Sequence, residues 1–222
     1  MQPWITLDVA AIPGGGEMRL KRRGAEFSIM LGGNELMNSR LSHSEEALAR
    51  LAAARLASRP QPSVLIGGLG FGFTLRAALA AFGPQARITV AELVPQVCAW
   101  ARGPLAGLFA GSLDDGRVDL VESDVAAIIR AGRGAWDAIL LDVDNGPDGL
   151  TAAANDALYG PAGLAAAWQA LRPGGRLAVW SAAPDRDFGQ RMARAGFRVE
   201  EVRVHAHRGG GARHVIWLGA RG

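Results

Sequence analysis

The sequence has one cysteine and no stretch typical of a membrane or secreted protein. Cys98 is the only cysteine in 222 residues, so the chain can form neither an internal disulfide nor a cysteine-based metal site. No apolar run reaches the roughly 18 residues that a membrane helix needs. The first residues lack the basic and apolar regions of a secretory signal. We therefore expect a cytoplasmic protein with no membrane partner and no metal ion.

Concentrated positive charge is also missing. The 24 Lys and Arg residues exceed the 21 Asp and Glu residues by a net charge of +3, yet no five basic residues stand together. Because nucleic-acid binding needs clustered basic residues, we expect no nucleic-acid partner. Hydrophobic residues make up 49% of the chain and charged residues 20%, which is a globular composition. A chain of this length can bury one substantial core.

Residues 1–58 differ in pattern from the rest of the chain. Glycine pairs and triplets separate strand-length segments at 4–9, 18–22 and 26–31, which predicts a small antiparallel β cap. Ser42 or Ser44 is the expected start of a following helix, and Pro60 and Pro62 come after its end. We interpret residues 1–58 as an N-terminal β cap with one helix.

Residues 59–222 alternate between apolar strands and helix-like segments. The expected strands are 64–66, 88–91, 118–121, 138–141 and 176–180, and the helices between them are 74–82, 95–102, 125–131 and 163–171. Apolar strands bounded by helices predict a parallel sheet covered on both faces. After a helix near 188–195, runs at 197–205 and 214–219 predict an antiparallel pair at the sheet edge. We therefore expect one Rossmann-like α/β domain of about seven strands.

A glycine-rich loop follows the first strand of this domain. Gly68, Gly70 and Gly72 alternate with larger residues just before a helix, and Glu92 ends the next apolar run about 20 residues later. Glycines let the backbone approach a ligand, and a carboxylate at that strand end can accept hydrogen bonds from ribose hydroxyls. The alternative is a tight strand-to-helix turn with a solvated acid.

Polar residues also end the next two strands. Ser123-Asp124 follows the third strand, and Asp124 can either accept a hydrogen bond from an adenine amino group or cap the next helix. Asp142-Val143-Asp144-Asn145 follows the fourth strand, where the reactive part of a cofactor would lie. The alternative there is a turn rich in Asp and Asn, because Gly146-Pro147 comes next.

These segments together resemble the spermidine synthases, which are polyamine aminopropyltransferases of the class I methyltransferase superfamily. The resemblance rests on residues 64–76, on Leu113-Asp114-Asp115-Gly116-Arg117-Val118, on Asp137-Ala138-Ile139-Leu140-Leu141-Asp142 and on Leu171-Arg172-Pro173-Gly174-Gly175. It extends over about residues 34–181. It implies a class I methyltransferase fold and a transferase that uses S-adenosylmethionine or its decarboxylated form.

The resemblance implies a role for each residue that matches. Gly68, Gly70 and Gly72 would approach the nucleoside, Glu92 would bind the ribose, and Ser123 with Asp124 would bind adenine. Asp142 would be the base that takes a proton from an attacking amine, and Asp144 would assist it. Glu46 and Asn145 would contact a small acceptor of the amine type, because they align with a glutamate and a second aspartate of the family. A homodimer is compatible with the resemblance and with the β cap.

One departure leaves the function open. The family carries an aspartate that holds the aminopropyl ammonium of the decarboxylated cofactor, and Phe71 stands in its place. A phenylalanine cannot pair with an ammonium, so Phe71 favours a methyltransferase that uses S-adenosylmethionine itself, whereas the overall resemblance favours alkylation of an amine. A third hypothesis is a nucleoside-binding protein without turnover.

Overall fold

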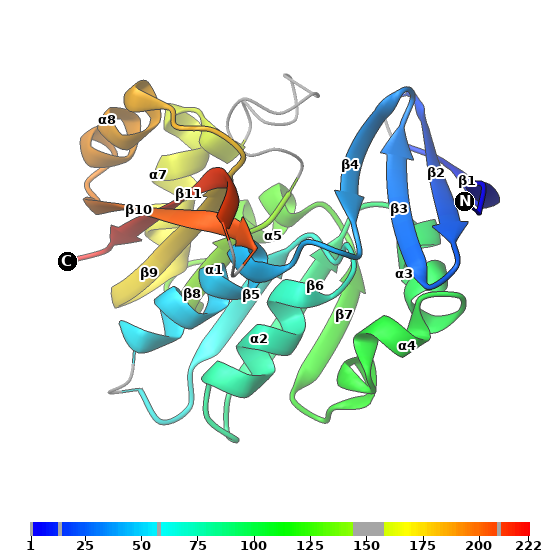
Figure 1. Cartoon of the computed structure of the whole chain (residues 1–222). Helices are drawn as coiled ribbons and strands as arrows, with labels where there is room; N and C mark the ends of the chain where they lie inside the picture. The colour runs from blue at the N-terminus through cyan, green and yellow to red at the C-terminus, as the bar shows by residue number, and fades with distance from the viewer. Residues whose placement is uncertain (1, 13–14, 57–58, 144–157, 208–209) are drawn as a thin grey trace.

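A seven-stranded sheet forms the centre of the computed structural model (Figure 1). The structure describes residues 2–12, 15–56, 59–143, 158–207 and 210–222. The sheet order is β10-β11-β9-β8-β5-β6-β7. Its strands are β5 (Ser63–Gly67), β6 (Arg87–Glu92), β7 (Val118–Glu122), β8 (Trp136–Leu141), β9 (Leu171–Ser181), β10 (Arg198–His207) and β11 (Gly210–Ala220).

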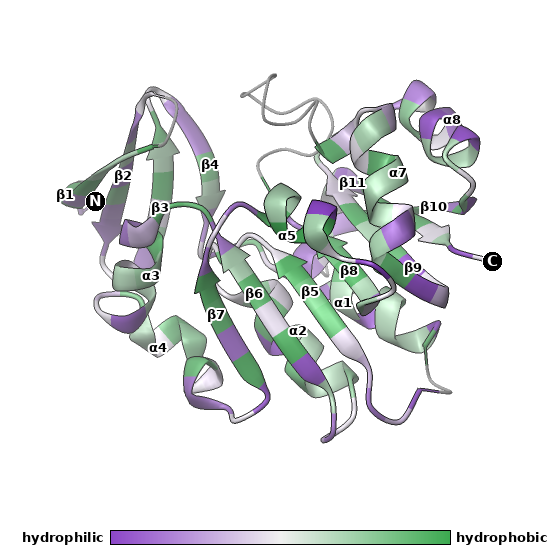
Figure 2. Cartoon of the chain, turned by 180° about the vertical axis from the view of Figure 1, so that it is seen from behind, coloured by the Kyte–Doolittle hydropathy of each residue, from purple (hydrophilic) through white to green (hydrophobic). Residues whose placement is uncertain are grey.

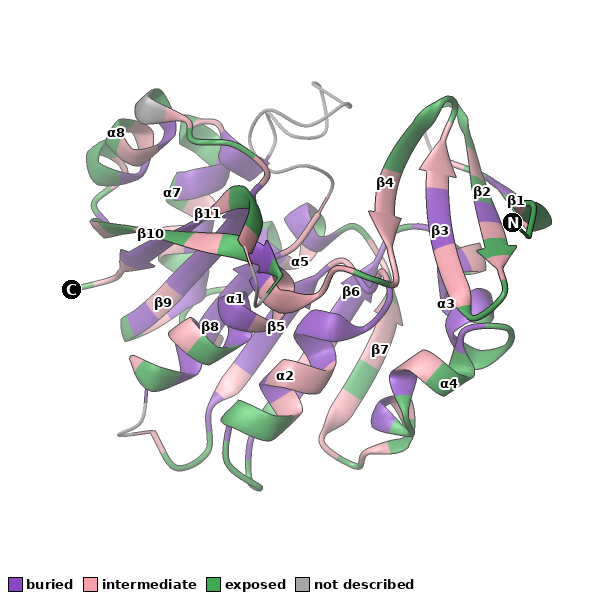
Figure 3. Cartoon of the chain, in the orientation of Figure 1, coloured by how far each residue is buried: buried purple, intermediate pink, exposed green. Residues whose placement is uncertain are grey.

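The apolar runs form the central strands because these strands are buried on both faces. Within β5, Val64 and Ile66 point into one core and Leu65 points into the other, as the two-residue period of a strand requires. Figure 2 shows the resulting hydrophobic colour along β5 and β8, and Figure 3 shows the same strands as buried. The expectation of a mostly parallel sheet of about seven strands is confirmed.

Helices cover both faces of the sheet. The first core lies under α1 (His43–Ala54), α2 (Phe73–Ala81), α3 (Pro95–Arg102) and α4 (Ala106–Phe109), and the second lies under α5 (Val125–Ala131), α7 (Pro161–Ala170) and α8 (Arg186–Arg194). A short 3₁₀ helix, η1 (Ser112–Asp114), precedes β7. In the described part of the chain, no helix is long and apolar enough to span a bilayer. Cys98 is buried in the first core.

The final hairpin is antiparallel, as expected, but it is built into the sheet. β11 lies between β9 and β10 and is antiparallel to both, so of the two hairpin strands β10 is the one at the sheet edge. The hairpin therefore contributes Val215 and Trp217 to the second core and Ile216 to the first.

The N-terminal cap is a separate four-stranded antiparallel sheet. Its strands are β1 (Ile5–Ala11), β2 (Glu17–Arg23), β3 (Glu26–Leu31) and β4 (Asn34–Asn38), in that order. The sequence predicted only the first three, because the polar residues of β4 conceal its strand character. Asp8 of β1 accepts hydrogen bonds from Gln96 and, at 2.8 Å, from the Trp100 indole N–H, both in α3. These contacts attach the cap to the large domain.

The helix that follows the cap packs on the large sheet. α1 lies beside α2 and contacts β8, β9, β10 and β11 (Figure 1). Its buried residues Leu48 and Ala52 belong to the same first core as β5. The domain boundary at residue 58 remains a prediction. By its contacts, α1 is one of the helices that cover the large sheet.

Candidate functional site

The ends of four neighbouring strands are tied together at the carboxyl edge of the sheet. The Asp142 amide donates to the Gly67 carbonyl oxygen at 3.0 Å, and the Gly68 amide donates to the Ala91 carbonyl oxygen at 2.9 Å. The Ser123 amide donates to the Glu92 carbonyl oxygen at 2.9 Å. Backbone hydrogen bonds therefore run from β8 through β5 and β6 to the end of β7. They hold the predicted residues of four chain segments side by side.

The glycines of the loop are required by space as well as by backbone angle. Gly68 has φ of 89°, and a Cβ there would collide with the Asp142 carbonyl oxygen. Gly72 has φ of 74°, and a Cβ there would collide with the Phe109 ring. Glycine is favoured at both positions for two reasons. A Cβ would collide with a neighbouring atom, and L side chains rarely adopt such φ values. The loop can thus pass directly between Asp142 and α4.

Glu92 fixes the glycine loop through its side chain. Oε2 accepts a hydrogen bond from the Leu69 amide at 2.9 Å, and Oε1 accepts one from the Val94 amide at 2.9 Å. The residue is buried, with 8% of its surface exposed. Glu92, at the end of β6, therefore determines the shape of the loop.

Asp124 is the N-cap of α5. Its Oδ1 accepts a hydrogen bond from the Ala126 amide at 2.8 Å, and its Oδ2 lies 3.6 Å from an Arg130 guanidinium nitrogen. The capping alternative is therefore present in the structure. The same residue also lines the cavity at this edge of the sheet, so the cap does not remove Asp124 from the site.

A cavity of about 190 Å³ connects these groups. One wall comes from the strand ends and carries Gly68, Gly70, Glu92, Ser123, Asp124 and Asp142. The opposite wall comes from the cap and is apolar, with Ile29, Leu36 and Met37 among its residues. A Cβ on Gly70 would lie 2.9 Å from the Met37 sulfur, so β4 closes over the loop. The cavity has one apolar wall and one acidic wall.

Phe71 does not line this cavity. Its side chain is 2% exposed and belongs to the first core, with its ring centroid 6.1 Å from that of Phe73. Gly70 and Gly72 on either side have positive φ values of 48° and 74°, and the chain turns the intervening side chain inward. The residue that differs from the family pattern is thus a core residue of this loop.

Asp142 lies at the end of β8 and faces the cavity and α2. The Thr74 hydroxyl of α2 donates to its Oδ2 at 2.6 Å. Burial raises the pKa of Asp142 to about 6, although the hydrogen bond from Thr74 opposes the shift. A carboxyl with a raised pKa can accept a proton near neutral pH, which suits a general base.

Glu45 of α1 is a second acidic residue near Asp142, since the Thr74 hydroxyl lies within hydrogen-bond distance of both residues. Burial, and then the charge of Asp142, raises the pKa of Glu45 to about 7. The Ser44 hydroxyl donates to Glu45 Oε2 at 2.6 Å, and Thr74 Oγ1 lies 3.2 Å from the Glu45 carbonyl oxygen. Two like charges in one partly buried site disfavour each other's ionised form. Sequence reasoning missed Glu45.

The structure does not bring Glu46 to this group. Its Oε2 lies 3.1 Å from an Arg50 guanidinium nitrogen, and its Oε1 accepts a hydrogen bond from Ser42 at 3.0 Å. One residue along a helix turns the side chain by about 100°, so neighbouring glutamates face different surroundings. The Ser42 backbone begins the helix, while its side chain bonds Glu46 instead of an amide of the first turn. Asp144 and Asn145 lie outside the described residues.

Known proteins resemble this chain in sequence and in fold. Polyamine aminopropyltransferase 1 of Streptomyces coelicolor is 35% identical over 129 residues, which are 57% of this chain and 23% of that protein. A spermidine synthase in complex with the transition-state analogue AdoDATO superimposes with a TM-score of 0.80 at 19% identity, over 98% of this chain and 74% of that one. The chain resembles the spermidine synthases. No family model matches it.

The spermidine synthase-like fold is also a methyltransferase fold. The 1,6-didemethyltoxoflavin-N1-methyltransferase of Burkholderia thailandensis, bound to 1,6-didemethyltoxoflavin and S-adenosylhomocysteine, superimposes with a TM-score of 0.54 at 21% identity, over 79% of each chain. The predicted class I methyltransferase fold is thus confirmed. The chain spans less than a quarter of the length of the curated relative that it matches.

In this spermidine synthase-like chain, the predicted acceptor contact Glu46 is paired with Arg50. The family resemblance assigned the acceptor contact to Glu46. The charge of Asp142 raises the pKa of Glu45, whereas the Glu46 carboxylate pairs with Arg50. An available signal was the Glu46–Arg50 spacing of four residues, which is typical of an exposed helix pair.

Proposed function

We propose that this chain is a transferase that binds an adenosyl sulfonium cofactor and alkylates a small acceptor of the amine type, with Asp142 as the general base. One observation carries the proposal: glycines and acids predicted from four separate chain segments line the same cavity. Residues at strand ends do not have to line a common cavity, because an Asp- or Asn-rich turn can face solvent instead. The resemblance to an aminopropyltransferase supports the same chemistry.

In this proposal the acidic wall of the cavity binds the nucleoside. Glu92, which lines the cavity at the end of β6, accepts hydrogen bonds from the ribose hydroxyls. Asp124, with Ser123 beside it, accepts a hydrogen bond from the adenine amino group. Apolar residues of β6, α3 and the cap surround the base. Gly68 and Gly70 allow the backbone to approach the sulfonium end.

The chemical step then needs a proton acceptor and correct positioning. An ammonium has no lone pair with which to attack carbon, so a nearby carboxylate must take its proton first. Asp142, with a pKa of about 6, is suited to that role near neutral pH. The sulfonium is a good leaving group, and alignment of the amine with the carbon–sulfur bond supplies much of the remaining acceleration. Asp144 and Asn145 remain proposed neighbours of the acceptor.

The charge of the cavity favours a cofactor without a carboxylate. The described lining residues include Glu92, Asp124 and Asp142 but no Lys, Arg or His. The sequence from 144 to 157 contains no Lys, Arg or His either. A carboxylate placed among these acids would lack a cationic partner, whereas an aminopropyl ammonium would be attracted. Because Phe71 lies in the core, it neither pairs with this ammonium nor blocks it. We therefore propose decarboxylated S-adenosylmethionine in preference to S-adenosylmethionine.

Calorimetry with S-adenosylmethionine, its decarboxylated form and methylthioadenosine tests this proposal. We expect the decarboxylated form to bind at least about tenfold more tightly than the parent, equivalent to about 1.4 kcal/mol. Incubation with an amine should then release methylthioadenosine. Preference for S-adenosylmethionine with release of S-adenosylhomocysteine would instead identify a methyltransferase. Binding without either product would identify a nucleoside-binding protein, and failure to bind any of the three would refute the proposal.

A further inference from the structure

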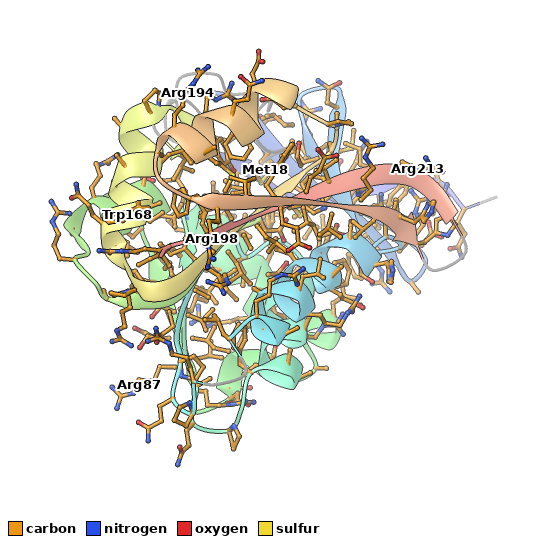
Figure 4. The ribbon with its side chains drawn as sticks, turned by 90° about the vertical axis from the view of Figure 1, so that its left-hand side faces the viewer. Met18, Arg87, Trp168, Arg194, Arg198 and Arg213 are labelled. Atoms are coloured by element: carbon orange, nitrogen blue, oxygen red, sulfur yellow. The ribbon has the colours of Figure 1, made fainter. Side chains whose placement is uncertain are left out.

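A chain of polar side chains extends from the Glu45–Asp142 pair to the final hairpin. His214 Nδ1 of β11 lies 2.9 Å from the Ser44 hydroxyl oxygen, and that hydroxyl donates to Glu45 at 2.6 Å. Ser44 is completely buried. The strand period places His214 on the same face as Ile216, which belongs to the first core under α1. Figure 4 shows β10 and β11 passing over α1, with Arg213, the chain neighbour of His214, labelled near one end of the hairpin.

The single proton of the Ser44 hydroxyl determines the direction of these hydrogen bonds. While Glu45 is ionised, Ser44 must donate to it, so the serine oxygen can only accept from His214, which then carries its proton on Nδ1. When Glu45 is protonated, its O–H can donate to Ser44. Ser44 then keeps both bonds only by donating to a bare Nδ1, so that His214 carries its proton on Nε2. The imidazole stays neutral in both arrangements, and the one added proton resides on Glu45.

The ring of His214 is held for this role. It packs edge-on against Trp180 of β9, with ring centroids 4.8 Å apart and planes at 74°. Burial lowers the pKa of His214, so the ring is neutral near pH 7, as both arrangements require. Among the described residues, the charge of Asp142, which follows β8, and the smaller effect of Glu46 on its own helix raise the pKa of Glu45. The Ser44 hydroxyl bonds its carboxylate, and the Thr74 hydroxyl of α2 lies at its backbone carbonyl.

We propose that His214 is a positioning residue that, through Ser44, holds Glu45 beside Asp142 in both of its protonation states. A buried carboxyl normally loses a hydrogen bond when it gains or releases a proton, and an unmet buried polar group is costly. The reversible His214–Ser44–Glu45 relay avoids that loss. The paired carboxyls can then hold an ammonium and take its proton in one fixed geometry. This use of the pair rests on the proposed function, whereas the relay itself does not.

The relay can be tested without turnover by nitrogen NMR of the histidine side chains. The chain has four histidines, so a His214→Asn variant assigns the signal. We expect the Nδ1–H tautomer of His214 above about pH 8 and conversion to the Nε2–H tautomer as the pH falls through about 7, the pKa of Glu45. Ser44→Ala should abolish the conversion. Ser112→Ala is the matched control, because Ser112 is also buried and its hydroxyl has no partner among the described residues. The inference is overturned if the His214 tautomer does not change with pH, or if it converts equally in Ser44→Ala.

Kinetics then test what the relay does for the pair. The hydrogen bond from Ser44 lowers the pKa of Glu45, so its loss should move the acidic limb of kcat/KM for the amine upward by about one pH unit. We expect Ser44→Ala and His214→Leu to raise the KM of the amine about tenfold at neutral pH and to leave the KM of the adenosyl cofactor unchanged. His214→Asn, whose amide can replace the Nδ1–H donor, should retain the original profile.

These outcomes separate the two proposals. If the unsubstituted chain binds no amine and transfers no alkyl group, the proposed function fails while the tautomer test still decides the relay. If turnover is present and Ser44→Ala retains the original pH profile and amine KM, the positioning role is refuted and the proposed function stands. An equal rise in the KM of the amine and of the cofactor would likewise refute it, because that result indicates general damage to the site.

Discussion

Replacement of Glu45 by glutamine should make the protein more stable at alkaline pH. Glutamine has nearly the same shape as glutamate, and its side-chain oxygen can still accept the hydrogen bond from Ser44. It cannot ionise, however, so the repulsion with Asp142 and the cost of burying a second charge disappear. The substitution removes a charge that the fold stabilises poorly.

The magnitude follows from the pKa of Glu45 in the folded chain. A carboxyl whose pKa is raised by folding holds its proton more tightly in the native state, so its stabilising contribution is complete below its ordinary pKa and is lost as the pH rises through the folded value. For Glu45 that window extends from 4.5 to about 7. At roughly 1.4 kcal/mol per pKa unit, the ionised group costs up to about 3 kcal/mol above pH 7. Glu45→Gln should recover about 1 to 3 kcal/mol there and almost nothing near pH 4, where the glutamate is already protonated.

Chemical denaturation at about pH 4 and about pH 8 measures this difference. A gain of 1 to 3 kcal/mol corresponds to a rise in Tm of roughly 2 to 12 °C for a chain of this size. Glu46→Gln is the matched control, because Glu46 is paired with Arg50 at the helix surface and such a pair contributes at most about 1 kcal/mol. The reasoning is refuted if Glu45→Gln gains the same stability at both pH values, or loses stability at about pH 8. Glu45→Gln should also bind the amine more weakly.

Three further substitutions test the site. Asp142→Asn should abolish alkyl transfer and leave the affinity for methylthioadenosine, which carries no ammonium, nearly unchanged by calorimetry; an unchanged rate would exclude Asp142 as the base. Gly68→Ala should cost at least about 1 to 3 kcal/mol in thermal unfolding and weaken cofactor binding, since its Cβ would meet the Asp142 carbonyl oxygen, whereas Gly107→Ala in α4 has nothing within 4 Å of the new Cβ and should be neutral or stabilising. Phe71→Asp should destabilise the chain by about 3 to 5 kcal/mol and should not improve binding of decarboxylated S-adenosylmethionine, because Phe71 is buried; tighter binding by this variant would show that its side chain reaches the cavity.

The sequence predicted the central strands of the large sheet well because each is buried on both faces. A run such as residues 138–141 is continuously apolar, and only a central strand of a covered sheet needs such a run. β4 was missed because its polar residues Asn34, Glu35 and Asn38 hide its pairing with β3. An edge strand of the cap sheet needs few apolar residues, so composition alone does not reveal β4.

The site was predictable where backbone geometry determines the residue type. Gly68 and Glu92 are constrained by steric contacts and backbone hydrogen bonds at the strand ends, and those constraints leave a pattern in the sequence. The choice between Glu45 and Glu46 depends on the rotation of α1 against the sheet, which packing determines. His214 was likewise unassigned, because its partner Ser44 is 170 residues away in the chain. Contacts of this kind have no local spacing to read.

In the proposed function, stability and ligand binding make opposite demands on the same two carboxyls. Burial raises the pKa of Asp142, and burial together with the charge of Asp142 raises the pKa of Glu45, so the folded chain without a ligand disfavours their ionised forms. An ammonium bound between them reverses this preference, because it favours the ionised form of each carboxyl. The free energy that ionisation of the two carboxyls costs without a ligand is therefore recovered in part when a cation binds, and this favours cationic over neutral ligands. In that account the relay through Ser44 keeps the pair ready without fixing its charge, since it can pair with Glu45 in either protonation state.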